Sequence, residues 1–427
     1  MLPLRRPLVT RGLPKLKNPL PGIRPHRVPG SISFQFCALT MAATMHPLAG
    51  LYKPNPLQAL YYGPLVVKDH LLSCLPSSSS KAFIITGSSL ATKTPLIKQV
   101  EELLGTEHHA GTFSNIKEHA PAAQLDQAAA LVEQDPSIDT IISVGGGSPI
   151  DSAKVISFRV NEKSGKFLTH IAVPTTLSAA ECTAIAGYTK EDGVKTGLMH
   201  PKVYPSSILY DASFGLYTPQ QLFLSTAIRA LDHAVESQYH PNATWMPCRL
   251  IALSAIQELF HWLPVYQRNP KDQDAITRLF LAAFASLGFL GQNIKSSLGL
   301  SHTLGYALGS PYGIPHGVTS CLTLGHVVKL KAEASEEDAD RIAGILPYIG
   351  EQRSGDNVRD AERVGDRILG LVKDLGLKTT LTEKGVGRDQ LDIICTRALG
   401  GLLPTKDISP EDAKKLATLR RLVEGLY

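Results

Sequence analysis

The sequence predicts an α/β domain built on a mostly parallel sheet, followed by an all-helical domain. Strand and helix patterns alternate from about residue 81 to residue 207, and only helix patterns follow residue 211. Such alternation is typical of a parallel sheet with helices on both faces. We expect an α/β dinucleotide-binding domain at residues 46–210, a helical substrate domain at residues 211–427, and an extension at residues 1–45.

Each element of the first domain is predicted by its own local pattern. Short apolar runs indicate buried strands, and amphipathic runs that end at glycine indicate helices. The expected elements are a strand at 82–86, a helix at 95–104 closed by Gly105, a helix at 124–134, a strand at 140–144, a helix that starts at Pro149, and a strand at 167–173.

The second domain shows apolar residues at helical spacing throughout. The expected helices cover residues 218–238, 247–267, 272–298, 335–348 and 360–375.

The loop after the strand at 140–144 is the most informative stretch of the chain. Three glycines at 145–147 are followed by Ser148, by Pro149 at the expected first helical position, and by a helix that carries Asp151. Glycine lets the backbone approach a ligand, and a helix start offers free N–H groups and a positive dipole end. The segment therefore predicts a pyrophosphate site rather than a plain tight turn, although its spacing is not GxGxxG.

Composition and charge exclude several classes of function. The net charge of +5 comes from residues 1–68, which hold nine Lys or Arg residues and no Asp or Glu. Because the remainder is slightly acidic, no nucleic-acid surface is expected. No apolar run approaches the roughly 18 residues of a membrane span. Six cysteines without CxxC spacing fit reduced thiols in an intracellular compartment.

The N-terminal segment is rich in Pro, Arg and Leu and contains no acidic residue. Transit peptides share this composition but are usually amphipathic helices, which recurring prolines disfavour. We expect a disordered extension, or a true start at Met41 or Met45, ahead of a targeting role. The expected location is cytoplasmic, and a mitochondrial one stays open.

Four ordered blocks resemble the iron-containing, or group III, alcohol dehydrogenase superfamily, and most nearly its maleylacetate reductase-like branch. The blocks are GGGSPIDSAK at 145–154, VPTT at 173–176, ALDHAVE at 230–236, and the stretch from GLSH to PHG at 299–317. The resemblance implies the fold of dehydroquinate synthase, with a substrate site between the two domains. It also implies a homodimer.

The resemblance implies NAD or NADP as the cofactor. It places the pyrophosphate at the glycine loop and the adenine and ribose near the threonines at 175–176. Lys195 would reach the nicotinamide ribose, although a surface lysine is the alternative. The cofactor-binding candidates are Gly87, Ser88, Gly146, Gly147, Ser148, Asp151, Thr175, Thr176 and Lys195.

The end of the first strand bears on the choice of dinucleotide. NAD-preferring relatives carry an Asp there, which repels the 2′-phosphate of NADP, whereas this chain has Gly87 followed by Ser88 and Ser89. Small hydroxyl groups can donate to a phosphate. We therefore expect a slight preference for NADP, limited because no arginine stands in the turn.

The metal-binding set of the superfamily is incomplete in this chain. His233, His302 and His316 match the three histidine ligands, but Arg229 replaces the Asp four residues before the first of them. Residues four apart share a helix face, so the guanidinium should lie beside His233, where its charge disfavours a divalent cation. We favour a metal-free site in which Arg229 and the histidines bind a substrate carboxylate. A three-histidine iron or zinc site and inherited core histidines are the alternatives.

Further features surround these histidines. Asp232 is adjacent but points about 100° away around the helix, and Glu236 is expected to be structural. The loop at 174–181 is one residue shorter than its counterpart in typical iron alcohol dehydrogenases and resembles that of maleylacetate reductases. This resemblance implies an enzyme that acts without a metal on an anionic keto acid. Tyr306, one turn after His302, replaces another histidine and would either donate a proton or pack.

These residues and the resemblance predict an NAD(P)H-dependent oxidoreductase that reduces a carbonyl or activated double bond of a small substrate bearing a carboxylate or another polar group. Arg229 and the three histidines would stabilise the developing oxyanion, and a histidine or Tyr306 would supply the proton. The alternatives are a metal-dependent alcohol dehydrogenase, a lyase like dehydroquinate synthase, and a degenerate nucleotide-binding homologue without turnover.

Overall fold

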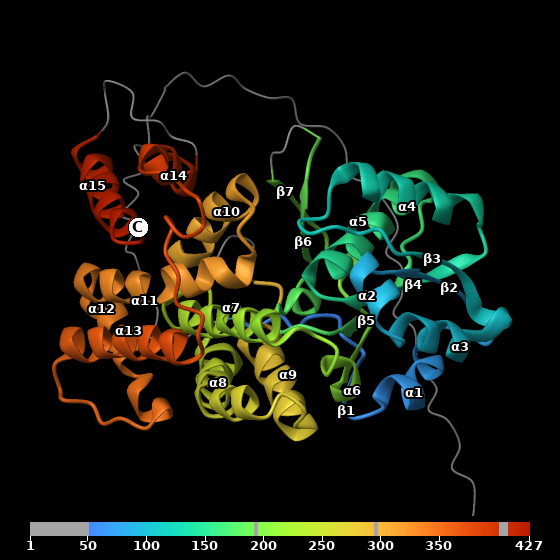
Figure 1. Ribbon diagram of the computed structural model, residues 1–427, viewed down its shortest axis with the longest axis horizontal. Coiled ribbons are helices and arrows are strands. Elements are labelled where there is room, and N and C mark those ends of the chain that lie inside the picture. The colour runs from blue at the N-terminus through green and yellow to red at the C-terminus, as the bar shows by residue number, and fades with distance from the viewer. Residues whose placement is uncertain (1–50, 192–194, 294–297, 401–408) are drawn as a thin grey trace, which may run out of the picture. The chain divides into compact units, whose positions relative to one another are not determined.

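A six-stranded parallel sheet forms the first half of the chain in the computed structural model, which describes residues 51–191, 195–293, 298–400 and 409–427 (Figure 1). The sheet order is β1-β8-β5-β4-β2-β3, and β6 and β7 form a separate antiparallel hairpin. The strands are β1 (Ala59–Gly63), β2 (Lys81–Ile85), β3 (His109–Phe113), β4 (Ile138–Gly145), β5 (Thr169–Pro174), β6 (Ile185–Thr189), β7 (Lys195–Met199) and β8 (Ser207–Asp211).

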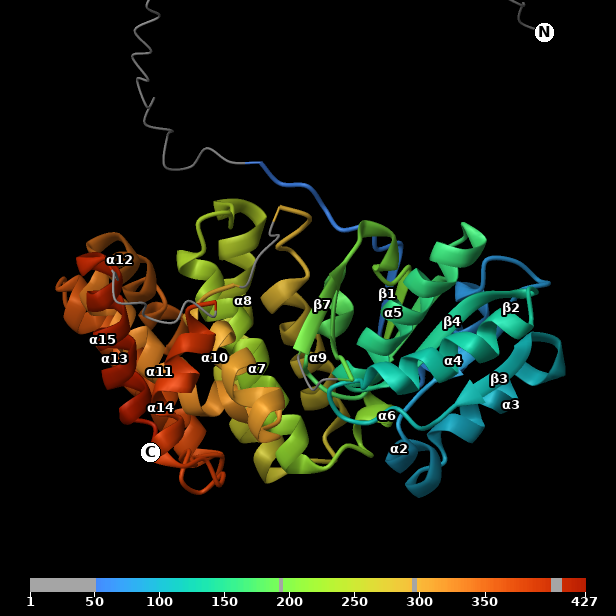
Figure 2. The same cartoon turned by 90° about the horizontal axis from the view of Figure 1, so that it is seen from above.

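Helices cover the sheet and make up the second half (Figure 2). In the α/β half they are α1 (Val66–His70), α2 (Ser88–Lys93), α3 (Leu96–His108), α4 (Ala122–Gln134) and α5 (Gly147–Ser164). In the helical half they are α6 (Ala212–Gly215), α7 (Gln220–Tyr239), α8 (Leu250–Arg268), α9 (Gln273–Leu287), α10 (Leu300–Tyr312), α11 (His316–Ala334), α12 (Glu336–Ala343), α13 (Asn357–Asp374), α14 (Leu391–Ala398) and α15 (Pro410–Glu424).

Alternation along the strands sends buried side chains to both faces of the sheet. Ile84 and Ile142 pack in one cluster with residues of α1 and α3, whereas Ile85 and Ile141 pack in another with α4 and α5. The expected fold class, a parallel sheet with helices on both faces followed by a helical region, is confirmed.

The helical half shares its core with the sheet. Ala172 of β5 and Tyr210 of β8 belong to the same buried cluster as residues of α7, α8 and α9. The Tyr210 ring stacks on Phe280 of α9 with ring centroids 5.0 Å apart. The loops at the carboxyl ends of the strands are therefore fixed against α7, which positions the site described below. The division at residues 210 and 211 stays a prediction.

The expected start of the helix after the glycine loop was wrong by two residues. α5 begins at Gly147, after an extended Gly146 (φ −83°, ψ −161°), so Pro149 is its third residue and not its first. The proline is tolerated because N–H groups in the first helical turn have no intrahelical acceptor.

Three other helix boundaries differ from those expected from the sequence. α9 ends at Leu287 rather than at 298, before a turn in which Gly291 has a φ of +67°. The pattern at 335–348 forms α12 and a separate 3-10 turn at Leu346–Ile349. α3 extends to His108 but is broken at Gly105 (φ 56°, ψ −172°), the residue expected to close it.

The sequence patterns did not predict β1, β3, β8 or the β6–β7 hairpin. The sequence of β3, HAGTF, holds a single large apolar residue, and the hairpin lies outside the main sheet, so neither has a buried-strand pattern.

None of the described helices is long and apolar enough to cross a membrane. The described cysteines are all unpaired: Cys74, Cys182, Cys248, Cys321 and Cys395.

Candidate active site

The glycine loop lies at the carboxyl end of β4 and is closely covered by the segment after β5. Gly145 has a φ of 139°, and its carbonyl accepts a hydrogen bond from the Thr175 amide at 2.9 Å. A Cβ on Gly146 would lie 3.1 Å from the Thr176 methyl group, and one on Gly147 would also meet a neighbouring side chain. No described side chain caps α5, so its first N–H groups can bind an anion.

The segment at Thr175–Leu177 joins the glycine loop to the helical half. The Thr175 carbonyl accepts from Thr218 Oγ1 at 2.6 Å, and the Leu177 amide donates to Thr226 Oγ1 of α7 at 3.1 Å. Thr176 Oγ1 is buried beside Gly146 without a hydrogen-bond partner in the described part of the chain. An unpaired hydroxyl beside side-chain-free backbone at a helix start fits a bound dinucleotide pyrophosphate.

The turn at Gly87 and Ser88 lies on the strand next to the glycine loop. β2 pairs with β4 in the register Ile85↔Ser143, so both loops leave the same edge of the sheet. Ser88 is exposed, and a Cβ on Gly87 would lie 3.2 Å from the Ile116 carbonyl oxygen. The turn and the glycine loop therefore lie at the same edge of the sheet, and the role of Gly87 and Ser88 toward a dinucleotide stays a prediction.

Two cofactor candidates lie elsewhere or carry other contacts. Asp151 accepts from the Gly187 amide of β6 at 3.0 Å and lies 3.5 Å from the buried Lys154 Nζ, so it holds the hairpin against α5. Lys195 begins β7 opposite Thr189. Their roles toward a cofactor stay predictions.

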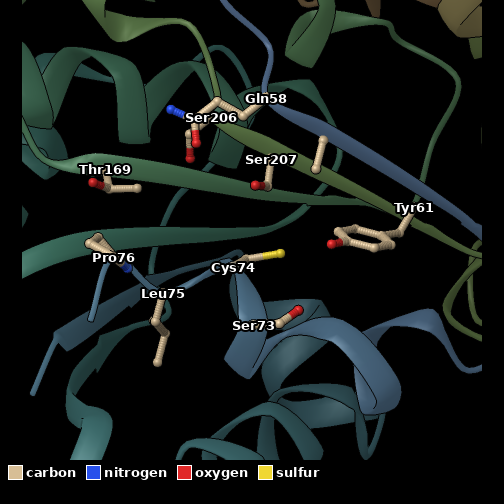
Figure 3. A pocket seen from close by; sticks show the side chains of 10 residues that line it. Gln58, Tyr61, Ser73, Cys74, Leu75, Pro76, Thr169, Ser206 and Ser207 are labelled. Carbon is tan, nitrogen blue, oxygen red and sulfur yellow. The ribbon is translucent and has the colours of Figure 1, made fainter. Parts of the chain in front are cut away.

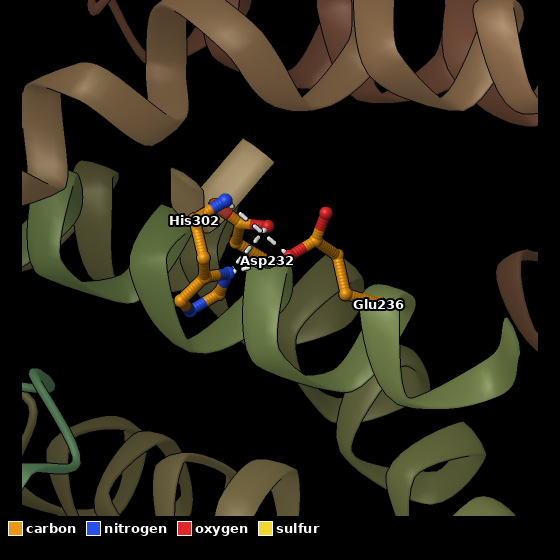
Figure 4. A group of neighbouring side chains, drawn as sticks. All are labelled: Asp232, Glu236 and His302. Atoms are coloured by element: carbon orange, nitrogen blue, oxygen red, sulfur yellow. Dashed lines mark hydrogen bonds and ion pairs between the residues drawn. The ribbon is translucent and has the colours of Figure 1, made fainter. Parts of the chain in front are cut away.

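On the helical side, His302 lies between two buried carboxylates. Its Nδ1 is 2.6 Å from Glu236 Oε2 and 3.4 Å from Asp232 Oδ1 (Figure 4). Burial and Arg229 act to lower the pKa of His302, but the two carboxylates outweigh them and raise it. Asp232 Oδ2 also accepts from Ser320 Oγ at 2.6 Å. These carboxylates therefore fix the ring orientation of His302.

His233 lies beside His302, with ring centroids 4.8 Å apart. Burial, His302 and Arg229 lower the pKa of His233 well below its usual value. Within the described residues, His233 Nδ1 and His302 Nε2 are buried and have no hydrogen-bond partner. Two unsatisfied imidazole nitrogens at one place are expected of a ligand site.

Arg229 is anchored in this polar cluster and is only 7% exposed. Its Nη1 donates to Ser320 Oγ at 3.3 Å and lies 3.7 Å from Asp232 Oδ2. A Cβ on Gly305 of α10 would lie 3.2 Å from the same nitrogen, so glycine makes room for the guanidinium. These contacts engage one edge of a group that has five N–H donors.

Tyr306 lies on α10, and His316 is the first residue of α11. A Cβ on Gly309 would lie 3.1 Å from His316 Cε1, and the Tyr306 and His316 rings meet edge to face at 5.9 Å. Tyr306 is 43% exposed. The ring of His119, which was not among the candidate residues, also meets the His316 ring edge to face, with centroids 5.4 Å apart.

The family resemblance implies a metal ion, and the residues present do not fit one. Tetrahedral ligands at about 2.1 Å from zinc lie about 3.4 Å from one another. Among the described residues the donor atoms that converge within 4.8 Å belong to Asp232, Glu236 and His302, and the three histidines form no such group. That set is hydrogen-bonded to the chain's own donors, and Arg229 adds a fixed positive charge.

A cavity of about 340 Å³ lies at the opposite edge of the sheet (Figure 3). Its lining includes Ala59, Thr169 and Ser207, which are the first residues of their strands, and Cys74. None of the predicted site residues lines it, so it is separate from the candidate site.

Comparisons with known proteins agree with this arrangement. Residues 60–212 match the family "Iron-containing alcohol dehydrogenase", and residues 223–421 match "Fe-containing alcohol dehydrogenase family, C-terminal". The chain belongs to the iron-containing alcohol dehydrogenase family and is an oxidoreductase of that family.

Two similar relatives are maleylacetate reductases. That of Sphingobium indicum is 29% identical over 76% of this chain and 86% of its own length. That of Pseudomonas knackmussii is 29% identical over 83% of this chain and 94% of its own length. The crystal structure of maleylacetate reductase from Agrobacterium tumefaciens shares the fold, with a TM-score of 0.70 and 23% identity over 89% of this chain and 98% of its own. These likenesses confirm the expected maleylacetate reductase-like branch.

Proposed function

We propose that this protein is an NAD(P)H-dependent reductase of a small keto acid and that it works without a metal ion. The observation that carries the proposal is the buried guanidinium of Arg229, held beside His233 and His302, whose free ring nitrogens face no protein partner in the described residues. A permanent cation beside two imidazoles is a site for a carboxylate or a developing oxyanion.

The glycine loop supports the cofactor half of the proposal. Backbone N–H groups at the start of α5 and the Thr176 hydroxyl bind the pyrophosphate, and the absence of a carboxylate at Gly87 leaves room for a 2′-phosphate. We therefore infer a slight preference for NADPH. When it is bound, the reduced nicotinamide supplies the hydride that reaches the substrate carbon.

Residues of the helical half stabilise the negative charge that develops on the substrate and supply the proton. Arg229 binds the substrate carboxylate and stabilises negative charge on the carbonyl oxygen. His302 keeps Nδ1 toward Glu236, so its Nε2 faces the site and delivers the proton to that oxygen. Asp232 and Ser320 hold Arg229 in place.

The relatives support an anionic substrate, because both named above are maleylacetate reductases. Their names refer to a keto acid, which matches the cationic site rather than that of a simple alcohol dehydrogenase. We infer that maleylacetate or a close analogue is a substrate of this chain.

Oxidation of NADPH with matched substrate pairs tests this proposal. Maleylacetate and other 3-keto and 4-keto acids are compared with their methyl esters and with aldehydes of equal length. We expect kcat/KM to be at least about tenfold higher for each free acid, since a charged hydrogen bond contributes about 1.5–3 kcal/mol. Equal rates for acids and esters would contradict the role of Arg229. No oxidation with any compound, despite NADPH binding, would instead indicate a degenerate homologue.

A further inference from the structure

The segment between β3 and α4 adopts a backbone conformation that non-glycine residues rarely take. His119 has a φ of 63° and Ala120 a φ of 46°, two successive left-handed residues. Both are held by Thr189 of β6, whose Oγ1 donates to the His119 carbonyl at 3.1 Å and whose amide donates to the Ala120 carbonyl at 3.2 Å. Ala120 is fully buried. Such strain persists where the surrounding structure enforces it, and it is common at functional sites.

This conformation brings the His119 side chain to the helical half. Its ring meets that of His316 edge to face, with centroids 5.4 Å apart and an interplanar angle of 86°. The Tyr306 ring also meets the His316 ring edge to face, with centroids 5.9 Å apart and an interplanar angle of 78°. Three partly exposed polar rings from both halves therefore gather at one place.

The cluster and Arg229 both pack against α10. Gly305 of α10 makes room for Arg229 Nη1, and Gly309 makes room for His316. Residues four apart on a helix are separated by about 6 Å along its axis and lie on the same face. The guanidinium and the ring cluster therefore occupy successive turns along one face of α10.

We propose that His119 is a substrate-binding residue, contributed by the α/β half, that binds a second carboxylate of the substrate about one helical turn from Arg229. The inference rests on the proposed function. An imidazole next to two other polar rings supplies the N–H donor that a carboxylate needs, and the spacing from Arg229 matches the two ends of a short keto dicarboxylate. His119 thereby sets the length and charge of the preferred substrate.

The test compares wild type with His119→Asn, because Asn accepts the left-handed backbone but is too short to reach the ring cluster. Substrates are a keto dicarboxylate and its distal monomethyl ester. We expect the variant to raise KM for the dicarboxylate at least about tenfold with little change in kcat, and to leave KM for the ester within about twofold. Ala120→Gly is the control for backbone strain and should change neither KM.

The outcomes separate the two proposals. If wild type reduces no keto acid, the proposed function fails. If wild type prefers keto acids but His119→Asn raises KM equally for the dicarboxylate and its ester, or for neither, only the role of His119 is overturned. The affinity of each variant for NADPH, measured by fluorescence titration, should match wild type, and its loss would also contradict a role confined to the substrate.

Discussion

The glycine loop and the polar cluster around His302 bind their ligands by different means. The loop at 145–147 is made of backbone at a strand end and a helix start, so a single stretch of sequence specifies it. The polar cluster is made of side chains from α7, α10 and α11, which meet only in the folded protein. A backbone site depends on the absence of side chains, whereas a side-chain site depends on charge balance among distant residues.

Gly146→Val should have the largest effect on this comparison. The added side chain would collide with Thr176 and fill the space over the start of α5. We expect NADPH affinity to fall about a thousandfold, or near 4 kcal/mol. Fluorescence titration measures it, with Gly370→Ala as the control because nothing lies within 4 Å of a Cβ at Gly370. Unchanged affinity would mean that the loop does not bind the cofactor.

Arg229→Gln tests the polar cluster around His302. We expect kcat/KM for keto acids to fall about a hundredfold and NADPH affinity to stay unchanged, because the lost group acts on the substrate. The melting temperature should also fall, since Asp232 loses a buried cation. Ser320→Ala, which removes an anchor but keeps the charge, should reduce kcat/KM much less. Equal losses in both variants would argue for a purely structural Arg229.

More of the glycine loop than of the polar cluster around His302 could be predicted from sequence. The parallel sheet and the glycine loop after its strand follow from local patterns, and the structure has both. The roles of Thr175 and Thr176 come from the family resemblance and stay predictions. Asp232 was set aside because it points away from His233 around α7, yet it binds Ser301, Ser320 and His302 from other helices. No sequence spacing encodes such long-range partners.

The left-handed backbone at His119 could not be predicted either, because it also depends on a residue distant in sequence. A left-handed φ at a non-glycine residue depends on Thr189, seventy residues away in sequence. Likewise, the helix start at Gly147 depends on how the covering segment packs against the loop. The charge-bearing residues could be predicted from sequence, but their pairing could not.

Glu181→Gln tests a buried carboxyl group in the segment that follows β5. Glu181 is buried in the segment that covers Gly147 with Ser178 and Ala180. Its Oε1 accepts a hydrogen bond from the Tyr210 hydroxyl at 2.5 Å, and burial raises the pKa of its carboxyl group from 4.5 to about 7. Between those values it is protonated only in the folded protein, so the stability of wild type should fall as pH rises through this window, by about 2 kcal/mol from pH 5 to 8. Denaturant unfolding at several pH values measures it, and the variant should lose this slope. A persisting slope in the variant would assign it to another group.

Gly87→Asp should have the smallest effect. The new carboxylate repels a 2′-phosphate, and we expect the NADPH-to-NADH preference to fall about fivefold. Because a Cβ there lies 3.2 Å from the Ile116 carbonyl, Gly87→Ala is the steric control and should leave the ratio unchanged. Competition titrations with both dinucleotides measure it, and an equal shift in both variants would remove the electrostatic explanation.

We propose that the fixed guanidinium of Arg229 takes the place of a metal ion in this member of the iron-containing family. The deciding measurement is the metal content of the purified protein, combined with NADPH oxidation before and after chelation. We predict much less than one iron or zinc per chain and keto acid reduction that survives chelation. One tightly bound ion per chain, with activity lost on its removal and restored on its return, would contradict the metal-free role of Arg229.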